Sequence, residues 1–195
     1  MTPIRFLLAV LLTLLPWVEA LAHPHGTMRC SLTVGFEAGR PTLLSGRLLM
    51  DAAHSKDMQA MLRDPATGLL DGQRQQRFMF SLKMQLARSN WLLGAQSGDV
   101  VAQLSPAREP ELVLTDDDRV GVDVALRIGP STDLPADAHW QFFCADPTFY
   151  WVTEFAIPPA PLAVTGCAAP VQSAAVAVAT GARAGSVQVG MRCAP

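Results

Sequence analysis

The chain carries little charge and no concentration of basic residues: 16% of its 195 residues are charged, and the formal net charge is −2. This balance argues against nucleic acid or an anionic membrane surface as a partner. Beyond the first 22 residues no stretch is long and apolar enough to span a bilayer, so we expect a mature chain without membrane insertion. A nucleophile elbow, a phosphate-binding loop, an H-E-x-x-H motif and paired catalytic carboxylates are absent. We therefore predict a protein that is not an enzyme and needs no organic cofactor.

The first 22 residues have the pattern of an export signal. Arg5 gives a positive start, residues 6–15 are apolar except for one threonine, and Ala20 and Ala22 form the A-x-A pattern that signal peptidase cuts after. The apolar run is about half the roughly 20 residues needed to cross a bilayer. We expect cleavage before His23 and localisation in the periplasm; an uncleaved N-terminal anchor is the alternative.

Four cysteines, an even number, are present in this predicted exported chain. Oxidising compartments favour disulfides, and the sequence has no C-x-x-C motif of the kind that zinc knuckles and thioredoxin-like sites use. Four cysteines permit three pairings. We favour Cys167 with Cys193, because both flank the same tail, and Cys30 with Cys144.

The mature chain, residues 23–195, is long enough for one domain with its own core. Period-two alternation predicts a hairpin of strands over 27–36 and 41–50, and later strands over 91–104, 111–114, 120–128 and 187–193. Helix-forming residues and apolar spacing predict helices over 51–63 and 74–88, with Asp51 or Ser55 as the first N-cap. We expect an α+β fold: a mainly antiparallel sheet or sandwich with a helical insertion at about 51–89. An alanine- and valine-rich tail, 167–195, follows and is tied by a disulfide.

The most aromatic segment, 139–157, is predicted to form one long or bulged central strand, interrupted at Asp146-Pro147. Three consecutive aspartates, 116–118, lack the spacing of a calcium loop and predict a solvated turn.

Methionines concentrate around the predicted helices. Thioethers are soft ligands that suit copper(I), although methionine is more often adaptable core filling. The five methionines concerned are Met50, Met58, Met61, Met79 and Met84.

Cleavage before His23 would expose a terminal His23-Pro24-His25 sequence. The terminal amine and Nδ1 of His23 chelate one metal, and a second imidazole completes the histidine brace used with copper. Pro24 has no amide N–H, so the alternative copper or nickel site that uses intervening amide nitrogens is excluded. Simple coordination of zinc, nickel or copper by the two imidazoles is also open. Distant residues that could complete the site are His54, His139 and Asp146; the opposing interpretation is an exposed, frayed terminus.

The Ala22-His23-Pro24-His25 start, the segment ADPTFYWVTEF at 145–155 and the closing VQVGMRC at 187–193 together resemble the family numbered 1007 among domains of unknown function. This resemblance implies a periplasmic component of an ABC-type transport system, often associated with metal-ion exporters or importers. Family members commonly carry a D-x-D-G-D-G stretch in the helical insertion. The corresponding residues 64–72 lack those alternating oxygen ligands, so the resemblance does not extend to calcium.

Cys30 and Cys144 depart from the family pattern, and a bridge between them requires the first strand and the aromatic strand to lie close together. If these strands pair antiparallel with the cysteines opposed, Met28 faces Asp146 and His25 faces Phe149.

Two functions from different classes follow. The first is an accessory protein that binds a late transition metal at His23 and His25, with Asp146 as a candidate third ligand, and serves a membrane metal transporter. The second is an adaptor module whose sheet edge binds a transporter subunit without metal. A copper-brace oxidase is a third reading, for which we find no flat substrate face.

Overall fold

The computed structural model describes residues 26–129, 138–148, 150–155, 162–173, 176–178 and 186–194. The strands up to residue 128 are β1 (Gly26–Glu37), β2 (Arg40–Met50), β3 (Leu93–Ser97), β4 (Val100–Val101), β5 (Leu104–Pro106), β6 (Glu111–Leu114) and β7 (Val120–Ile128). The later strands are β8 (Trp140–Cys144), β9 (Trp151–Phe155), β10 (Leu162–Thr165), β11 (Ala169–Gln172), β12 (Val176–Val178) and β13 (Ser186–Ala194). The helices are α2 (Ala52–Leu62), α3 (Gly72–Arg88) and the short 3₁₀ turn η1 (Asn90–Leu92).

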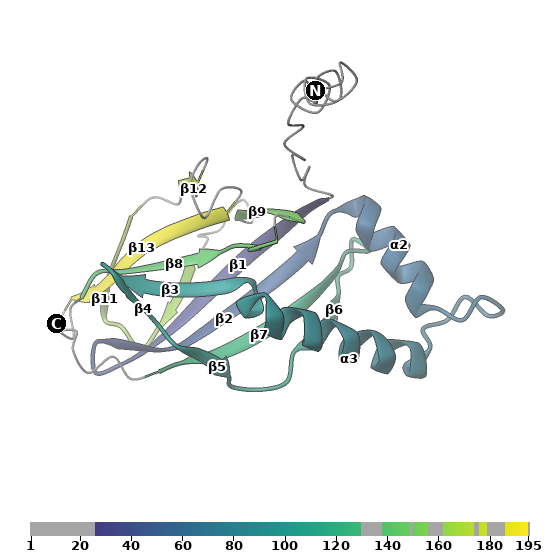
Figure 1. Ribbon diagram of the computed structural model, residues 1–195, viewed down its shortest axis with the longest axis horizontal. Helices are drawn as coiled ribbons and strands as arrows, with labels where there is room; N and C mark the ends of the chain where they lie inside the picture. Colours follow the sequence, from purple (N-terminus) through teal and green to yellow (C-terminus); the bar gives the residue numbers. More distant parts are fainter. Residues whose placement is uncertain are drawn as a thin grey trace, which may run out of the picture.

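The strands form two sheets, and both α-helices lie at one end of the molecule (Figure 1). The first sheet has the order β10-β1-β2-β7-β5, with β6 also paired to β7 and β9 also paired to β1. The second has the order β11-β13-β8-β3-β4, with β12 also paired to β13. All pairings are antiparallel except those of β9 and β10 with β1. The predicted α+β class with a mainly antiparallel sheet and a helical insertion is confirmed.

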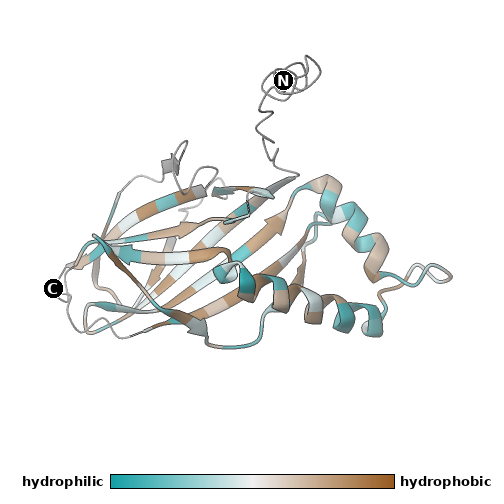
Figure 2. Cartoon of the chain, in the orientation of Figure 1, coloured by the Kyte–Doolittle hydropathy of each residue, from teal (hydrophilic) through white to brown (hydrophobic). Residues whose placement is uncertain are grey.

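The core lies between the two sheets. Alternate residues of β1 are buried, because successive side chains of a strand point to opposite faces. These residues and the buried residues of the second sheet belong to one hydrophobic cluster, and the strands in Figure 2 show this alternation in hydropathy. Fully or nearly fully buried members include Cys30, Leu32, Val34, Ala95, Phe142, Cys144, Val189 and Met191.

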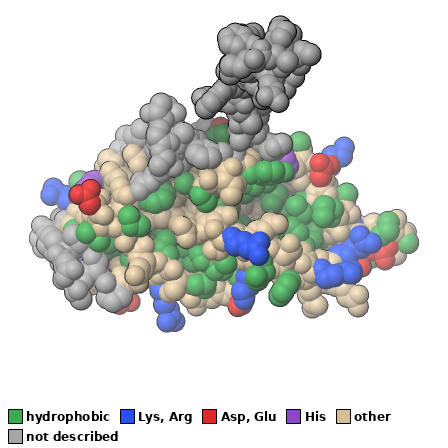
Figure 3. All heavy atoms as spheres, viewed as in Figure 1, with side chains coloured by type: hydrophobic (Ala, Val, Ile, Leu, Met, Phe, Trp, Pro, Cys, Tyr) green, Lys and Arg blue, Asp and Glu red, His purple; other side chains and the backbone are tan. Residues whose placement is uncertain are grey.

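The helices form where the sequence predicts them. Asp51 is the N-cap of α2 and accepts a hydrogen bond from the His54 backbone N–H. Asp71 is the N-cap of α3 and accepts from the backbone N–H groups of Gln73 and Arg74. Leu86 is buried on α3, and Met79 and Leu82 pack against the core cluster. Phe80 and Met84 point outward; Figure 3 shows hydrophobic and basic side chains together at the helical end of the molecule. In the described part of the chain, neither helix has the length and apolar character needed to cross a membrane.

The prediction of one central strand over 139–157 is wrong, but the interruption predicted at Asp146-Pro147 is confirmed. This segment forms β8 in the second sheet and β9 in the first, and the chain crosses between the sheets at Asp146-Pro147. The antiparallel arrangement considered for the first strand and the aromatic strand does not occur, because β8, which carries Cys144, pairs with β3 and β13 and not with β1. Instead β9 runs parallel to β1, with Gly26 opposite Trp151 and Met28 opposite Thr153.

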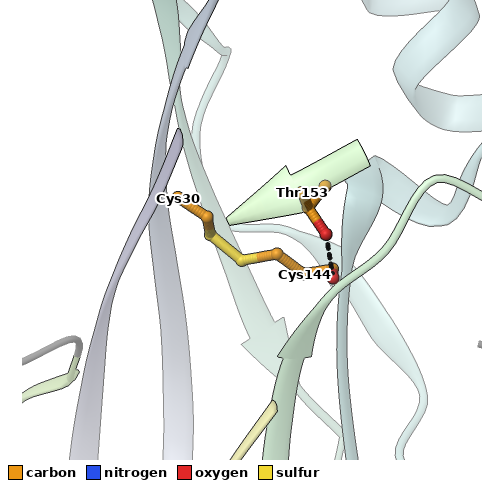
Figure 4. The surroundings of a disulfide bond; sticks show 3 residues. All are labelled: Cys30, Cys144 and Thr153. Carbon is orange, nitrogen blue, oxygen red and sulfur yellow. Dashed lines mark hydrogen bonds between the residues drawn. A yellow bond between two sulfur atoms is a disulfide. The ribbon is translucent and has the colours of Figure 1, made fainter. Parts of the chain in front are cut away.

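Both predicted disulfides are confirmed. Cys30 of β1 and Cys144 of β8 join the two sheets across the core (Figure 4). The Thr153 hydroxyl on β9 donates to the Cys144 carbonyl at 2.8 Å, so the bridge, β8 and β9 are held together. Cys167 and Cys193 tie the tail, where the predicted last strand is present as β13.

Candidate metal site

The predicted ligands His23 and His25 lie outside the described residues, as does the predicted export signal. The described part of the chain begins at Gly26, which follows His25 and is the first residue of β1. The chemistry of the two histidines therefore stays a prediction. What the structure does describe is the surroundings of Gly26, the residue that follows His25 in the sequence.

Gly26 lies against two aromatic side chains from other elements. A Cβ atom added to Gly26 would lie 2.5 Å from Cε1 of His54 on α2 and 2.6 Å from Cζ3 of Trp151 on β9. Only glycine permits so close an approach of the backbone. The His54 and Trp151 rings meet edge to face, with centroids 4.7 Å apart. The His23-Pro24-His25 segment is thus joined to a residue that contacts a third histidine.

Asp51 orients the His54 ring. Its carboxylate accepts hydrogen bonds from the His54 backbone N–H at 2.9 Å and from the Thr27 backbone N–H at 2.9 Å. The two oxygens also lie 3.0 and 2.9 Å from Nδ1 of His54. Because an ionised carboxylate can only accept, Nδ1 is the donor, and in the neutral ring the lone pair then lies on Nε2. A carboxylate on the far ring nitrogen is the usual support of a metal-ligating histidine.

The Asp51 carboxylate is held in its ionised form. Partial burial opposes the charge, but hydrogen bonds from the backbone N–H groups of His54 and Thr27 and from the His54 side chain outweigh it. Together with the attraction to His54, they lower the pKa of Asp51 from 3.8 to about 2. At neutral pH the residue is therefore an acceptor that fixes the tautomer of His54.

Asp146 and His139, the other candidates, are engaged elsewhere. Asp146 is buried, and its carboxylate accepts from the Thr148 backbone N–H at 2.9 Å, the Thr148 hydroxyl at 2.7 Å and the Trp151 N–H at 3.0 Å. These bonds shape the turn from β8 to β9, the role that an aspartate before proline commonly has. His139 is exposed at the start of β8 and lies beside Gly190 of β13. His139 is not brought to Gly26. Asp146 is bonded to Trp151, the strand partner of Gly26, but its carboxylate is already used by the hydrogen bonds of its own turn.

Sequence reasoning named His54 but missed its partner. Asp51 was identified only as a helix cap, although its spacing of three residues from His54 places both side chains on the first turn of α2. Among the described residues no group of three or more His, Cys, Asp or Glu side chains could hold a metal ion. A complete site in this region would need ligands from residues before Gly26.

Comparison with known proteins adds no assignment: no family model matches the chain, and no curated protein matches it in sequence.

Proposed function

We propose that this chain is an exported, periplasmic accessory protein that binds a late transition metal through the terminal His23-Pro24-His25 sequence and serves a membrane metal transporter. The observation that carries the proposal is the oriented imidazole of His54 at Gly26. The resemblance of the terminal segments to family 1007 supports the link to metal transport, and the two disulfides fit an oxidising compartment.

His54 supplies the third imidazole that a pair of terminal histidines lacks. Three imidazoles form a common ligand set for zinc and also suit copper and nickel. Asp51 stays charged over the whole neutral range, so it holds Nδ1–H and raises the basicity of Nε2. The bound metal would lie at one end of the first sheet, where a membrane partner can receive it.

The test is calorimetric titration of the processed protein with Zn²⁺, Ni²⁺ and Cu²⁺. We expect His23→Ala and His25→Ala each to abolish the tightest uptake and His54→Ala to weaken it. Asp51→Asn should cost about 10–100-fold in affinity, the usual effect of removing a carboxylate behind a ligating histidine. The matched control is His139→Ala, which removes the remaining histidine from an exposed position away from Gly26. Equal metal uptake by wild type and by the three histidine variants would refute the proposal.

The mode of binding is tested separately. One extra residue before His23 removes the terminal amine from the chelate. Loss of Cu²⁺ binding in this variant would assign a histidine brace, and retained binding would assign simple imidazole coordination.

A second candidate, the adaptor without metal, is favoured by the outer face of α3 rather than by a sheet edge. Phe80 is 72% exposed and Met84 is 48% exposed, one turn apart. The exposed Arg77 and Arg88 lie on the same stripe, and α3 contains no acidic residue. Hydrophobic side chains that remain exposed beside basic ones are typical of a contact surface.

The adaptor is tested by co-sedimentation of the exported protein with membranes of the producing cells. We expect Phe80→Ser with Met84→Ser to release the protein from the membranes if this face binds a membrane subunit. The double variant His23→Ala with His25→Ala should stay bound in that case. The opposite pattern would favour the metal-dependent function.

A further inference from the structure

Three methionines line a single cavity between the helices and the strands. The cavity has a volume of about 520 Å³, and its walls include Met28 of β1, Met50 of β2 and Met58 of α2. Phe78, Leu82 and Trp151 complete much of the apolar wall. The three thioethers come from different elements but face one space.

The backbone brings the three side chains together. Met28 and Met50 are direct partners across the β1–β2 pair and are only 4% and 6% exposed. Partners of this kind have Cβ atoms about 4.5–5.5 Å apart on the same face of the sheet. Ser55 of α2 is buried and donates to the Met50 carbonyl at 3.2 Å, which fixes the helix against the end of β2. Met58 follows Ser55 by three residues and so lies on the same inward face of the helix.

These methionines do not simply fill the core. Core methionines adapt to gaps and leave few voids larger than a water molecule. Here the three side chains border an open space of about 520 Å³ that twelve further residues also line, so they are not packed on every side. Tyr150 also lines the cavity and is 45% exposed, so the space reaches the surface and an ion can enter.

The chemistry of the wall selects a soft cation. Thioethers favour copper(I), whereas zinc, calcium and magnesium prefer nitrogen, thiolate or oxygen ligands. The carboxylate in the wall, Asp146, is already occupied by the backbone and hydroxyl of its own turn. The face of an indole such as Trp151 also attracts a cation.

We propose that this cavity binds copper(I) through the thioethers of Met28, Met50 and Met58. The site uses none of the residues of the proposed histidine site, so either can exist without the other. The methionine site would bind copper(I), whereas the terminal imidazoles suit divalent ions.

The test uses Ag⁺, a redox-inert probe for copper(I), in chloride-free buffer, followed by competition with a chromogenic Cu⁺ chelator. Both are done on the full chain carrying His23→Ala and His25→Ala, so that terminal imidazoles do not contribute. We expect one Ag⁺ per chain by native mass spectrometry. We expect a loss of Ag⁺ affinity of about tenfold or more in each single variant, Met28→Leu, Met50→Leu and Met58→Leu, because each lacks one of three ligands. The triple variant lacks all three and should not bind Ag⁺.

Leucine conserves the volume of methionine, so these variants keep the fold; matching circular dichroism spectra and unfolding midpoints check this. Met84→Leu is the control, since Met84 is exposed on α3 and does not line the cavity. We expect its Ag⁺ affinity to equal that of the parent. Undiminished binding by the triple variant, no uptake by the parent, or an equal loss in Met84→Leu would overturn the proposal.

Discussion

Asp51 offers the sharpest test of the geometry around Gly26, through the variants Asp51→Asn and Asp51→Ala. The folded protein lowers its pKa from 3.8 to about 2. At 1.36 kcal/mol per unit this corresponds to roughly 2 kcal/mol of stability. Because the side chain is 29% exposed, solvent screening reduces the expected contribution to about 1–2 kcal/mol. Asp51→Asn keeps the helix cap but loses this charge. Asp51→Ala should lower the free energy of unfolding by about 1 kcal/mol more than Asp51→Asn, because the cap is lost as well.

The contribution depends on pH with a definite sign. A folded-state pKa below the unfolded value means that the unfolded chain binds the proton more readily, so stability from Asp51 is complete above about pH 4. It is lost as the pH falls towards about 2. The difference in unfolding free energy between wild type and Asp51→Asn should therefore shrink by about 1–2 kcal/mol between pH 7 and pH 2.

Urea-induced unfolding at the two pH values measures this difference. Asp57→Asn is the matched control, since Asp57 lies on the same helix, is exposed and does not cap it. We expect Asp57→Asn to change the free energy of unfolding by a similar small amount at both pH values. A deficit in Asp51→Asn that stays constant from pH 7 to pH 2 would refute the assignment of an ionised, hydrogen-bonded carboxylate behind His54.

Two further predictions concern the frame of the site. The Cys30–Cys144 bridge closes a sequence separation of 114 residues, so chain entropy predicts that Cys30→Ala with Cys144→Ala lowers the free energy of unfolding by about 4.8 kcal/mol. The Cys167–Cys193 bridge closes 26 residues, and the corresponding loss for Cys167→Ala with Cys193→Ala is about 3.5 kcal/mol. Urea unfolding should rank the pairs in this order, and the reverse ranking would contradict the loop-length argument. Gly26→Ala places a methyl group 2.5 Å from His54 and should destabilise the fold by about 1–3 kcal/mol while weakening divalent-metal uptake; unchanged stability and uptake would show that the contact is not tight.

Local patterns in the sequence were sufficient for the first hairpin and both helices. The strands β1 and β2 follow the alternation of buried and exposed residues, and the turn at Ala38-Gly39 takes positive φ values of 48° and 76°. Asp51 caps α2 because its side chain accepts from the free backbone N–H of His54, a purely local effect. Interactions of this range are encoded within a few residues, so they can be predicted.

The crossing of the aromatic segment between the sheets could not be predicted in the same way. A period of two is equally compatible with one long strand and with two strands in different sheets. The choice depends on distant partners: β8 pairs with β3 and β13, and β9 pairs with β1. Similarly, η1 joins α3 to β3 through three successive positive φ values at Asn90, Trp91 and Leu92, and no glycine in the sequence indicates them.

The position of Met50 in the cavity for which we propose copper(I) binding depends on one irregularity in the first hairpin. Near the turn Phe36 lies opposite Pro41, but from Gly35 onwards the register moves by one residue, and Gly35 lies opposite Leu43. If the register seen near the turn continued along the strands without this bulge, Met28 would lie opposite Leu49. Met50 would then lie on the other face of the sheet, because a shift of one residue reverses the side of every side chain. The single extra residue in β2 therefore turns the second thioether towards the first, and the methionine pair depends on the bulge rather than on the spacing of methionines in the sequence.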